Sequence, residues 1–318
     1  MLPETTPSLS FMDAPAMPAL TRRSFLQSGL ALGASAMSGT LLPAIDPIPR
    51  RGKAPMRLSI AAYSYRDFLT GKKQPAMTLE DFVDRAADMG LSAVELTSYY
   101  FKDSSPAALT KLRGRCTRLG LDVSGGAVGN NFCLTDTAKW QSEIDKVKEW
   151  IDRYALLGAK AIRIFAGTLP KGGTEEEARR RSVEAIQQAC DHAAKVGIYL
   201  ALENHGGITA TAEQLLAIVK TVQHEWFGVN LDTGNFRTDD PYGDLARLAP
   251  YAVNVQVKTE MHPKGKKKEP ADLARLVRIL SEANYRGYVA LEYEAAEDPL
   301  TAIPRHVEEL KKLLHAAS

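Results

Sequence analysis

The amino-acid sequence predicts an α/β fold, a single (β/α)8 TIM barrel, over residues 57–318. Two patterns support this prediction. Short apolar segments alternate with longer segments of helical periodicity along the whole range, which is typical of parallel β-structure. Eight apolar segments recur about every 33 residues, the size of one strand–helix unit. Eight such units fill the range and leave no residues for a second domain.

The predicted strands are short apolar runs, and each is followed by a helical segment. Parallel strands joined by helices close into a barrel when eight such units follow one another. In chain order the strands are expected at Leu58–Tyr63, Ala93–Leu96, Leu121–Gly125, Ala161–Phe165, Ile198–Glu203, Phe227–Leu231, Ala252–Lys258 and Tyr288–Glu292.

Two of the intervening helices carry start and stop signals. One is expected to begin at Thr78, with acidic residues directly after it, and to end at Gly90. The other begins at Thr174, followed by three glutamates, and ends near Gly197. Acidic residues at a helix start complement the helix dipole, and glycine at the end suits the C-cap.

An open, doubly wound sheet is the alternative arrangement of alternating strands and helices. It requires a glycine-rich phosphate-binding turn after the first strand, and the segment Ala61–Tyr65 contains no glycine. The glycines of Gly125–Gly129 lack the GxGxxG spacing. We expect this second segment to form a flexible loop over the site.

The composition is that of a globular protein and gives no basis for a nucleic-acid partner. The chain has 40 Lys and Arg against 38 Asp and Glu, 45% hydrophobic residues and 25% charged residues. Its three cysteines, Cys116, Cys133 and Cys190, are far apart and form no CxxC pair. This pattern argues against both a disulfide framework and a thiolate zinc site.

Residues 1–56 are predicted to be a twin-arginine signal peptide and a linker. The segment Thr21–Leu26 reads TRRSFL, and no charged residue occurs from Ser24 to Ile45. This run is too weakly apolar for a spanning helix, and Ala34–Ala36 offers small residues for cleavage. We therefore expect export by the twin-arginine pathway and a periplasmic protein. The alternative is a disordered tail with an accidental arginine pair.

Polar residues end the last four predicted strands: Glu203, Asp232, Gln256 and Glu292. Because the carboxyl ends of barrel strands meet at one rim, we expect these side chains to converge there. Three carboxylates without a matching set of cations repel each other, and a bound divalent ion is the simplest way to hold them together. Gln256 is the weakest member, since its amide can instead form hydrogen bonds inside the barrel.

Oxygen ligands with room for water or substrate define the predicted cofactor, one divalent metal ion. They suit Mn²⁺, Mg²⁺ or Co²⁺ better than a structural zinc, and we expect Mn²⁺, with Zn²⁺ as a further alternative. Glu95, near the end of the second strand, is expected in a barrel layer or in an ion pair with Arg163.

The segments LENHGG (202–207) and LDTGN (231–235), with the strand-end Glu292, resemble the sugar phosphate isomerase/epimerase superfamily of xylose isomerase-like barrels. The resemblance covers residues 57–316 and is most specific from 198 to 294. It implies a single metal ion held by Glu203, Asp232, Gln256 and Glu292. The chain departs from the family pattern at two positions. The family usually has His at the position of Gln256, and its epimerases often have His at the position of Asn235.

The expected function is that of a divalent-metal-dependent sugar isomerase or epimerase. The ion polarises a carbonyl group and stabilises the enediolate formed when the neighbouring carbon loses a proton. Glu203 and Glu292 are the candidate base and acid, in either order, and the resemblance implies that they are also ligands. Lys258 and His205 are expected to stabilise the oxyanion or to orient hydroxyl groups. Their alternative roles are an ion pair with a rim carboxylate and a supporting hydrogen bond.

Export favours a small, unphosphorylated carbohydrate as the substrate. The same metal and base can act on a 3-keto-glycoside, where proton loss at C2 expels the C1 substituent by β-elimination. A carbon–oxygen lyase is therefore one alternative function, and a non-catalytic sugar-binding barrel is another. The basic segment Lys264–Lys268 is expected to be a solvated charge run. A homo-oligomer is compatible with the sequence.

A metal-dependent endonuclease on the same barrel is disfavoured. Such an enzyme needs several histidine ligands, and of the six histidines only His205 closely follows a rim position.

Overall fold

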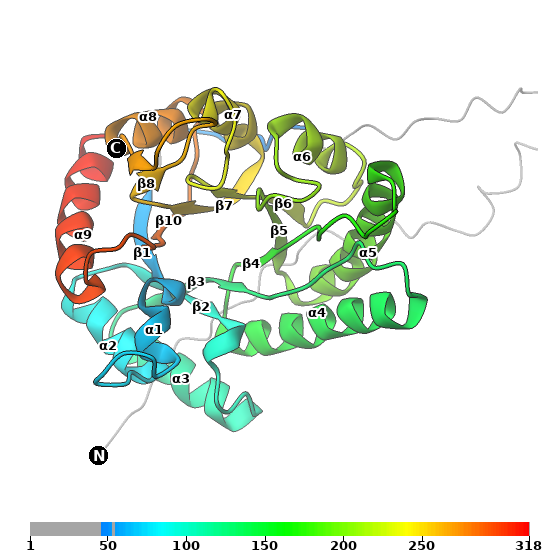
Figure 1. Ribbon diagram of the computed structural model, residues 1–318. Helices are drawn as coiled ribbons and strands as arrows, with labels where there is room; N and C mark the ends of the chain where they lie inside the picture. The colour runs from blue at the N-terminus through cyan, green and yellow to red at the C-terminus, as the bar shows by residue number, and fades with distance from the viewer. Residues whose placement is uncertain (1–45, 53–54, 318) are drawn as a thin grey trace, which may run out of the picture. The chain divides into compact units, whose positions relative to one another are not determined.

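The computed structural model describes residues 46–52 and 55–317. The predictions made for residues 1–45, including the twin-arginine signature and the cleavage site, lie outside the described residues. Among the described residues, parallel strands close into a barrel, and helices surround it (Figure 1). The predicted (β/α)8 fold is therefore confirmed.

The barrel strands are hydrogen-bonded in the order β1-β10-β7-β6-β5-β4-β3-β2. The barrel closes where Ser59 of the first strand pairs with Ala290 of the last. The barrel strands are β1 (Arg57–Ala61), β2 (Ala93–Thr97), β3 (Asp122–Ala127), β4 (Ala161–Ile164), β5 (Tyr199–Glu203), β6 (Phe227–Asp232), β7 (Ala252–Val257) and β10 (Tyr288–Leu291).

Amphipathic helices pack their apolar faces against the outside of the strands. They are α1 (Arg66–Leu69), α2 (Leu79–Asp88), α3 (Pro106–Arg118), α4 (Thr137–Leu157), α5 (Glu175–Val196), α6 (Ala212–Val219), α7 (Pro241–Leu248), α8 (Leu273–Glu282) and α9 (Pro299–Ala316), with short 3₁₀ turns at Ala62–Tyr65, Ser98–Tyr100 and Ala249–Tyr251. In the described part of the chain, no helix combines the length and apolar character needed to cross a membrane.

The predicted helix signals form the expected caps. Thr78 accepts a hydrogen bond from the amide of Asp81, whose carboxylate in turn accepts one from the amide of Thr78. Thr174 and Glu177 form the same reciprocal pair at the start of α5, and Gly197 ends that helix in the left-handed conformation with φ 72°. These contacts satisfy amide groups that the first turn leaves without partners.

The expected flexible loop at Gly125–Gly129 is wrong, because Gly125 and Gly126 lie inside β3 and are buried. A Cβ atom on Gly126 would stand 2.2 Å from the ring of Tyr154, whose hydroxyl donates to the carbonyl of Leu96 at 2.6 Å. Glycine is present here because a helix side chain packs directly against the strand backbone.

A short antiparallel pair, β8 (Glu260–Met261) and β9 (Glu269–Pro270), extends the loop after β7. The basic segment Lys264–Lys268 connects these two strands and is exposed. Lys264 lies 3.8 Å from Asp239, and Lys268 pairs with Glu260. The segment is therefore a surface charge run with acidic neighbours.

Candidate active site

The carboxyl ends of β5, β6, β7 and β10 bring the predicted residues to one rim of the barrel. Glu203, Asp232, Gln256 and Glu292 are 3%, 0%, 1% and 6% exposed. Asp232 and Gln256 are register partners on neighbouring strands. Three buried carboxyl groups at one rim are costly unless cations or hydrogen bonds stabilise them.

One cation is supplied by Lys258, which directly follows β7. Its Nζ lies 3.2 Å from Oδ2 of Asp232 and 3.7 Å from Oε2 of Glu292. Nζ also donates to Oε2 of Glu294 at 2.8 Å and to Oδ1 of Asn235 at 3.2 Å. Lys258 is thus in the ion pair that the sequence offered as its alternative role.

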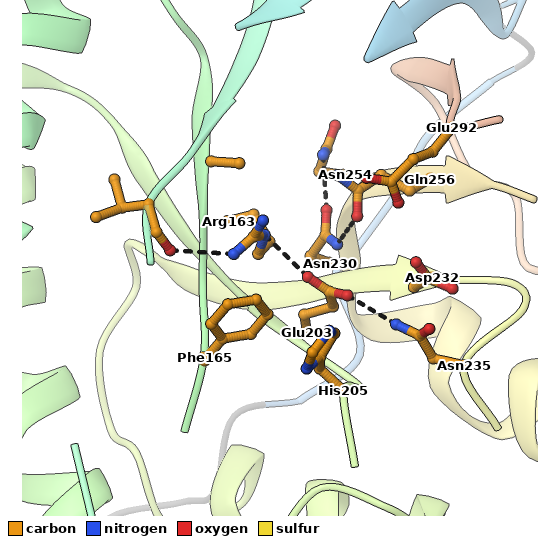
Figure 2. A network of polar contacts seen from close by, with 12 residues as sticks. Arg163, Phe165, Glu203, His205, Asn230, Asp232, Asn235, Asn254, Gln256 and Glu292 are labelled. Atoms are coloured by element: carbon orange, nitrogen blue, oxygen red, sulfur yellow. Dashed lines mark hydrogen bonds and ion pairs between the residues drawn. The ribbon is translucent and has the colours of Figure 1, made fainter. Parts of the chain in front are cut away.

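The second cation is Arg163 of β4. Its Nε lies 2.9 Å from Oε2 of Glu203, and its Nη1 donates to the carbonyl of Val128 at 3.0 Å (Figure 2). The guanidinium carbon lies 4.0 Å from the ring centre of Phe165. The rim therefore contains two cations, Arg163 and Lys258, which offset part of the negative charge of the carboxylates.

The other oxygen of Glu203 is held by Asn235, which the sequence did not place in the site. Its Nδ2 donates to Oε1 of Glu203 at 2.8 Å (Figure 2). Its Oδ1 accepts a hydrogen bond from Nζ of Lys258. Asn235 therefore links the two ion-paired clusters. The only signal at this position was its place three residues after Asp232, where the resemblance led us to expect His.

Gln256 lies beside the cluster and bonds into the barrel interior. Its Nε2 donates to Glu95 at 2.5 Å, and its Oε1 accepts from Asn230 at 2.7 Å. Asn254 donates to Glu95 and to Asn230, at 2.7 Å in each case. Glu95 is 0% exposed. Glu95 therefore lies in a barrel layer, the first of its two predicted positions. The ion pair of Arg163 is formed with Glu203 and not with Glu95.

Burial governs the protonation of the rim. Burial raises the pKa of Glu203 to about 7, although the charge of Arg163 acts to lower it. Burial likewise raises the pKa of Asp232 to about 6, although the charge of Lys258 acts to lower it. Burial also raises the pKa of Glu292 to about 8, again against Lys258. For Lys258, burial disfavours the charged form, but Asp232, Glu292 and Glu294 outweigh it and hold the pKa well above its usual value. Protons are therefore exchangeable at this rim near neutral pH.

His205 lies at the mouth of the site. Its ring packs against Phe165 with ring centres 4.4 Å apart, and burial lowers its pKa. It lines an open cavity of about 700 Å³ together with Asn235 and Arg237. A smaller cavity of about 200 Å³ is lined by Asn235, Arg237, Lys258 and Glu294. Two hollows thus flank Asn235, and the smaller one reaches the ammonium group.

The donor set at the rim fits a divalent ion in its chemistry. Oδ2 of Asp232 is buried, and its partner among the described residues is the ammonium of Lys258 at 3.2 Å. Five carboxyl groups (Glu95, Glu203, Asp232, Glu292 and Glu294) lie near two cations, Arg163 and Lys258, so full ionisation of the carboxyl groups would leave an excess of negative charge. In residues 46–52 and 55–317, no group of three or more His, Cys, Asp and Glu side chains stands at metal-binding spacing.

Comparison with known proteins places most of the chain in one family. A family model described as a xylose isomerase-like TIM barrel matches residues 83–313. A 2-oxo-tetronate isomerase of Haemophilus influenzae is 24% identical over 254 residues, which cover 76% of this chain and 87% of that protein.

Solved structures of other proteins share the fold. The 3-keto-D-glucoside 4-epimerase YcjR of E. coli has a TM-score of 0.64 and 16% identity, and the match covers 81% of this chain and 99% of that one. An IolI protein with a bound zinc atom has a TM-score of 0.65 and 20% identity, and the match covers 82% of this chain and 98% of that one. At these identities the likeness shows the fold alone.

Proposed function

The chain belongs to the xylose isomerase-like TIM barrel family, and on that premise we propose that it is a divalent-metal-dependent sugar isomerase or epimerase. The reaction is removal and return of a proton on the carbon next to a carbonyl group, through an enediolate. One observation carries the proposal. The buried carboxylates of Asp232 and Glu292 lie 3.2 Å and 3.7 Å from the ammonium nitrogen of Lys258, and Asn235 connects that nitrogen to the buried Glu203.

The residues that would hold the ion are Glu203, Asp232, Glu292 and Gln256, all oxygen donors. When bound, a divalent ion supplies charge that polarises the substrate carbonyl and stabilises the enediolate. Oxygen donors of this kind suit Mn²⁺, with Mg²⁺, Co²⁺ and Zn²⁺ as alternatives.

Proton transfer is assigned to Glu203 and Glu292. Burial brings the pKa of both carboxyl groups close to neutral, where a group can both accept and return a proton. Lys258 supplies a fixed positive charge for the oxyanion. Asn235 forms hydrogen bonds with both Lys258 and Glu203 and so holds the two side chains in fixed relative positions. His205, at the mouth of the cavity, is placed to orient substrate hydroxyl groups.

We propose a small, unphosphorylated carbohydrate as the substrate and the periplasm as the location, because the segment Thr21–Leu26 matches the twin-arginine export signature. A second candidate function is a lyase acting on 3-keto-glycosides. The two hollows on either side of Asn235 favour it, since they leave room for a sugar and its C1 substituent. The first step, proton removal beside the ketone, is the same.

The test is a substrate screen in D2O with added Mn²⁺. Free ketoses and 3-keto-glucosides are incubated with the protein, and deuterium at the α-carbon and loss of the C1 substituent are followed by NMR. We expect exchange that stops when the ion is chelated and returns with Mn²⁺. Binding of sugars without any exchange would show a sugar-binding barrel instead.

A further inference from the structure

A closed ring of four hydrogen bonds lies inside the barrel next to the proposed metal site. Asn254 donates to Oε2 of Glu95 and to Oδ1 of Asn230. Asn230 donates to Oε1 of Gln256, and Gln256 donates back to Oε1 of Glu95. These side chains come from β2, β6 and β7, and none is more than 3% exposed.

The ring has a direction, and Glu95 sets it. Both oxygens of Glu95 accept hydrogen bonds, so the two amides that face it present their NH2 groups. A neutral amide in its place would allow the ring to run in either direction.

The orientation of Gln256 decides what this residue offers to the rim. Its nitrogen is committed to Glu95, so its oxygen is the end left for a ligand. Oε1 has two lone pairs, of which Asn230 uses one. Oε1 can therefore accept one further contact, and Gln256 is the register partner of Asp232 on the neighbouring strand.

We propose that Glu95 is a positioning residue that fixes the amide of Gln256 with its oxygen available to the metal ion. The inference rests on the proposed metal site and deepens it. A buried carboxylate behind a ligand holds that ligand in one orientation.

The first test is calorimetric titration of the apo protein with Mn²⁺. We expect Glu95→Gln to weaken Mn²⁺ binding about 10- to 100-fold, the usual effect of losing an outer partner of a ligand. The matched control is Ser59→Ala. Ser59 and Ser124 form another buried pair in the barrel, with oxygens 2.7 Å apart, and do not contact Gln256. The control should bind Mn²⁺ as the parent does.

The second test exchanges the acceptor and donor positions. Gln256→Glu alone sets two carboxylates against each other and should lower the Tm of the apo protein. The double variant Glu95→Gln, Gln256→Glu restores one acceptor and one donor, and should recover most of that Tm and bind Mn²⁺ at least as tightly as Glu95→Gln. This Tm is measured without metal or substrate, so it does not depend on the proposed function.

The outcomes separate the two ideas. If the parent binds no Mn²⁺, the proposed function fails at its metal site and the positioning role falls with it. If the parent binds Mn²⁺ and Glu95→Gln binds it equally well, the metal site stands and the positioning role of Glu95 is overturned. Failure of the double variant to recover Tm also overturns it, because the directional ring would not exist.

Discussion

The guanidinium of Arg163 and the carboxylate of Glu203 form an ion pair with Nε and Oε2 2.9 Å apart and with 6% and 4% of the side chains exposed. It links β4 to β5 at the rim and fixes one oxygen of a proposed catalytic residue. Because both partners are out of water, loss of either leaves an uncompensated buried charge.

Arg163→Met should therefore lower the free energy of unfolding by about 3–5 kcal/mol. Urea denaturation of the apo protein measures it. The control is Arg305→Met, which removes an exposed pair with Glu297 and should leave stability close to that of the parent. Equal loss in the two variants would show that the burial of the Arg163 pair has no energetic consequence.

Gly126→Ala should destabilise the barrel by about 1–3 kcal/mol, the usual effect of overpacking. The new Cβ would meet the ring of Tyr154, which is fixed by its hydrogen bond to Leu96. The matched control is Gly114→Ala in α3, where the Cβ meets only the end of the Arg118 side chain and helix propensity improves. Thermal unfolding should give opposite signs for the two variants.

Much of the fold follows from local patterns in the sequence. The barrel strands and the caps at Thr78 and Thr174 follow from hydrophobic periodicity and capping chemistry, which act over a few residues. The mistaken loop at Gly125–Gly129 shows the limit. Glycine alone reads as a flexible turn, and its true cause, Tyr154, is 28 residues beyond Gly126.

The site shows the same division. Glu203, Asp232 and Glu292 could be predicted because strand ends share one rim. Arg163 and Asn235 could not be assigned to their partners, since their contacts depend on which side chains pack across the barrel. Glu95 was placed in its layer, but its ring with Gln256 required the structure.

Replacing Arg22 and Arg23 together by Lys should leave full-length precursor in the cytoplasm. The pair precedes an uncharged and weakly apolar run, which is typical of a twin-arginine signal. Cell fractionation and immunoblotting measure the precursor and the processed form. Normal processing of the double variant would contradict the export proposal, which stays a prediction for residues outside the described part of the chain.

The stability of the apo protein should fall as pH rises from about 4.5 to about 8. Burial raises the pKa of Glu203 to about 7 and that of Glu292 to about 8, so between these limits the folded state holds more protons than the unfolded state. The stability that Glu203 and Glu292 contribute is thus fully present below their pKa in the unfolded chain. It is lost as pH rises through their pKa in the folded protein.

Denaturation curves across this range measure the slope. Glu292→Gln removes one of the titrating groups and should flatten it, and Mn²⁺ should raise stability most at high pH, where the carboxylates are ionised. Stability that rises with pH in the apo protein would contradict the assignment of these raised pKa values.

The two glutamates should have different roles in the proton transfer. Arg163 lies 2.9 Å from Glu203, whereas the ammonium of Lys258 lies 3.7 Å from Glu292. The closer cation stabilises the carboxylate form of Glu203 more strongly, which makes Glu203 the base and Glu292 the acid at neutral pH.

Glu203→Gln should then abolish deuterium exchange at the substrate α-carbon in D2O. Glu292→Gln should retain exchange at that carbon but lose product about 10²–10⁴-fold, because the enediolate still forms and is not protonated on the other side. Metal content must be measured beside each rate, since loss of the ion would mimic loss of the base. Glu149→Gln, which removes an exposed carboxylate paired with Arg153 in α4, is the control and should stay near the parental rate. The reverse pattern would exchange the two roles, and near-parental turnover of both metal-loaded variants would exclude either glutamate from the reaction.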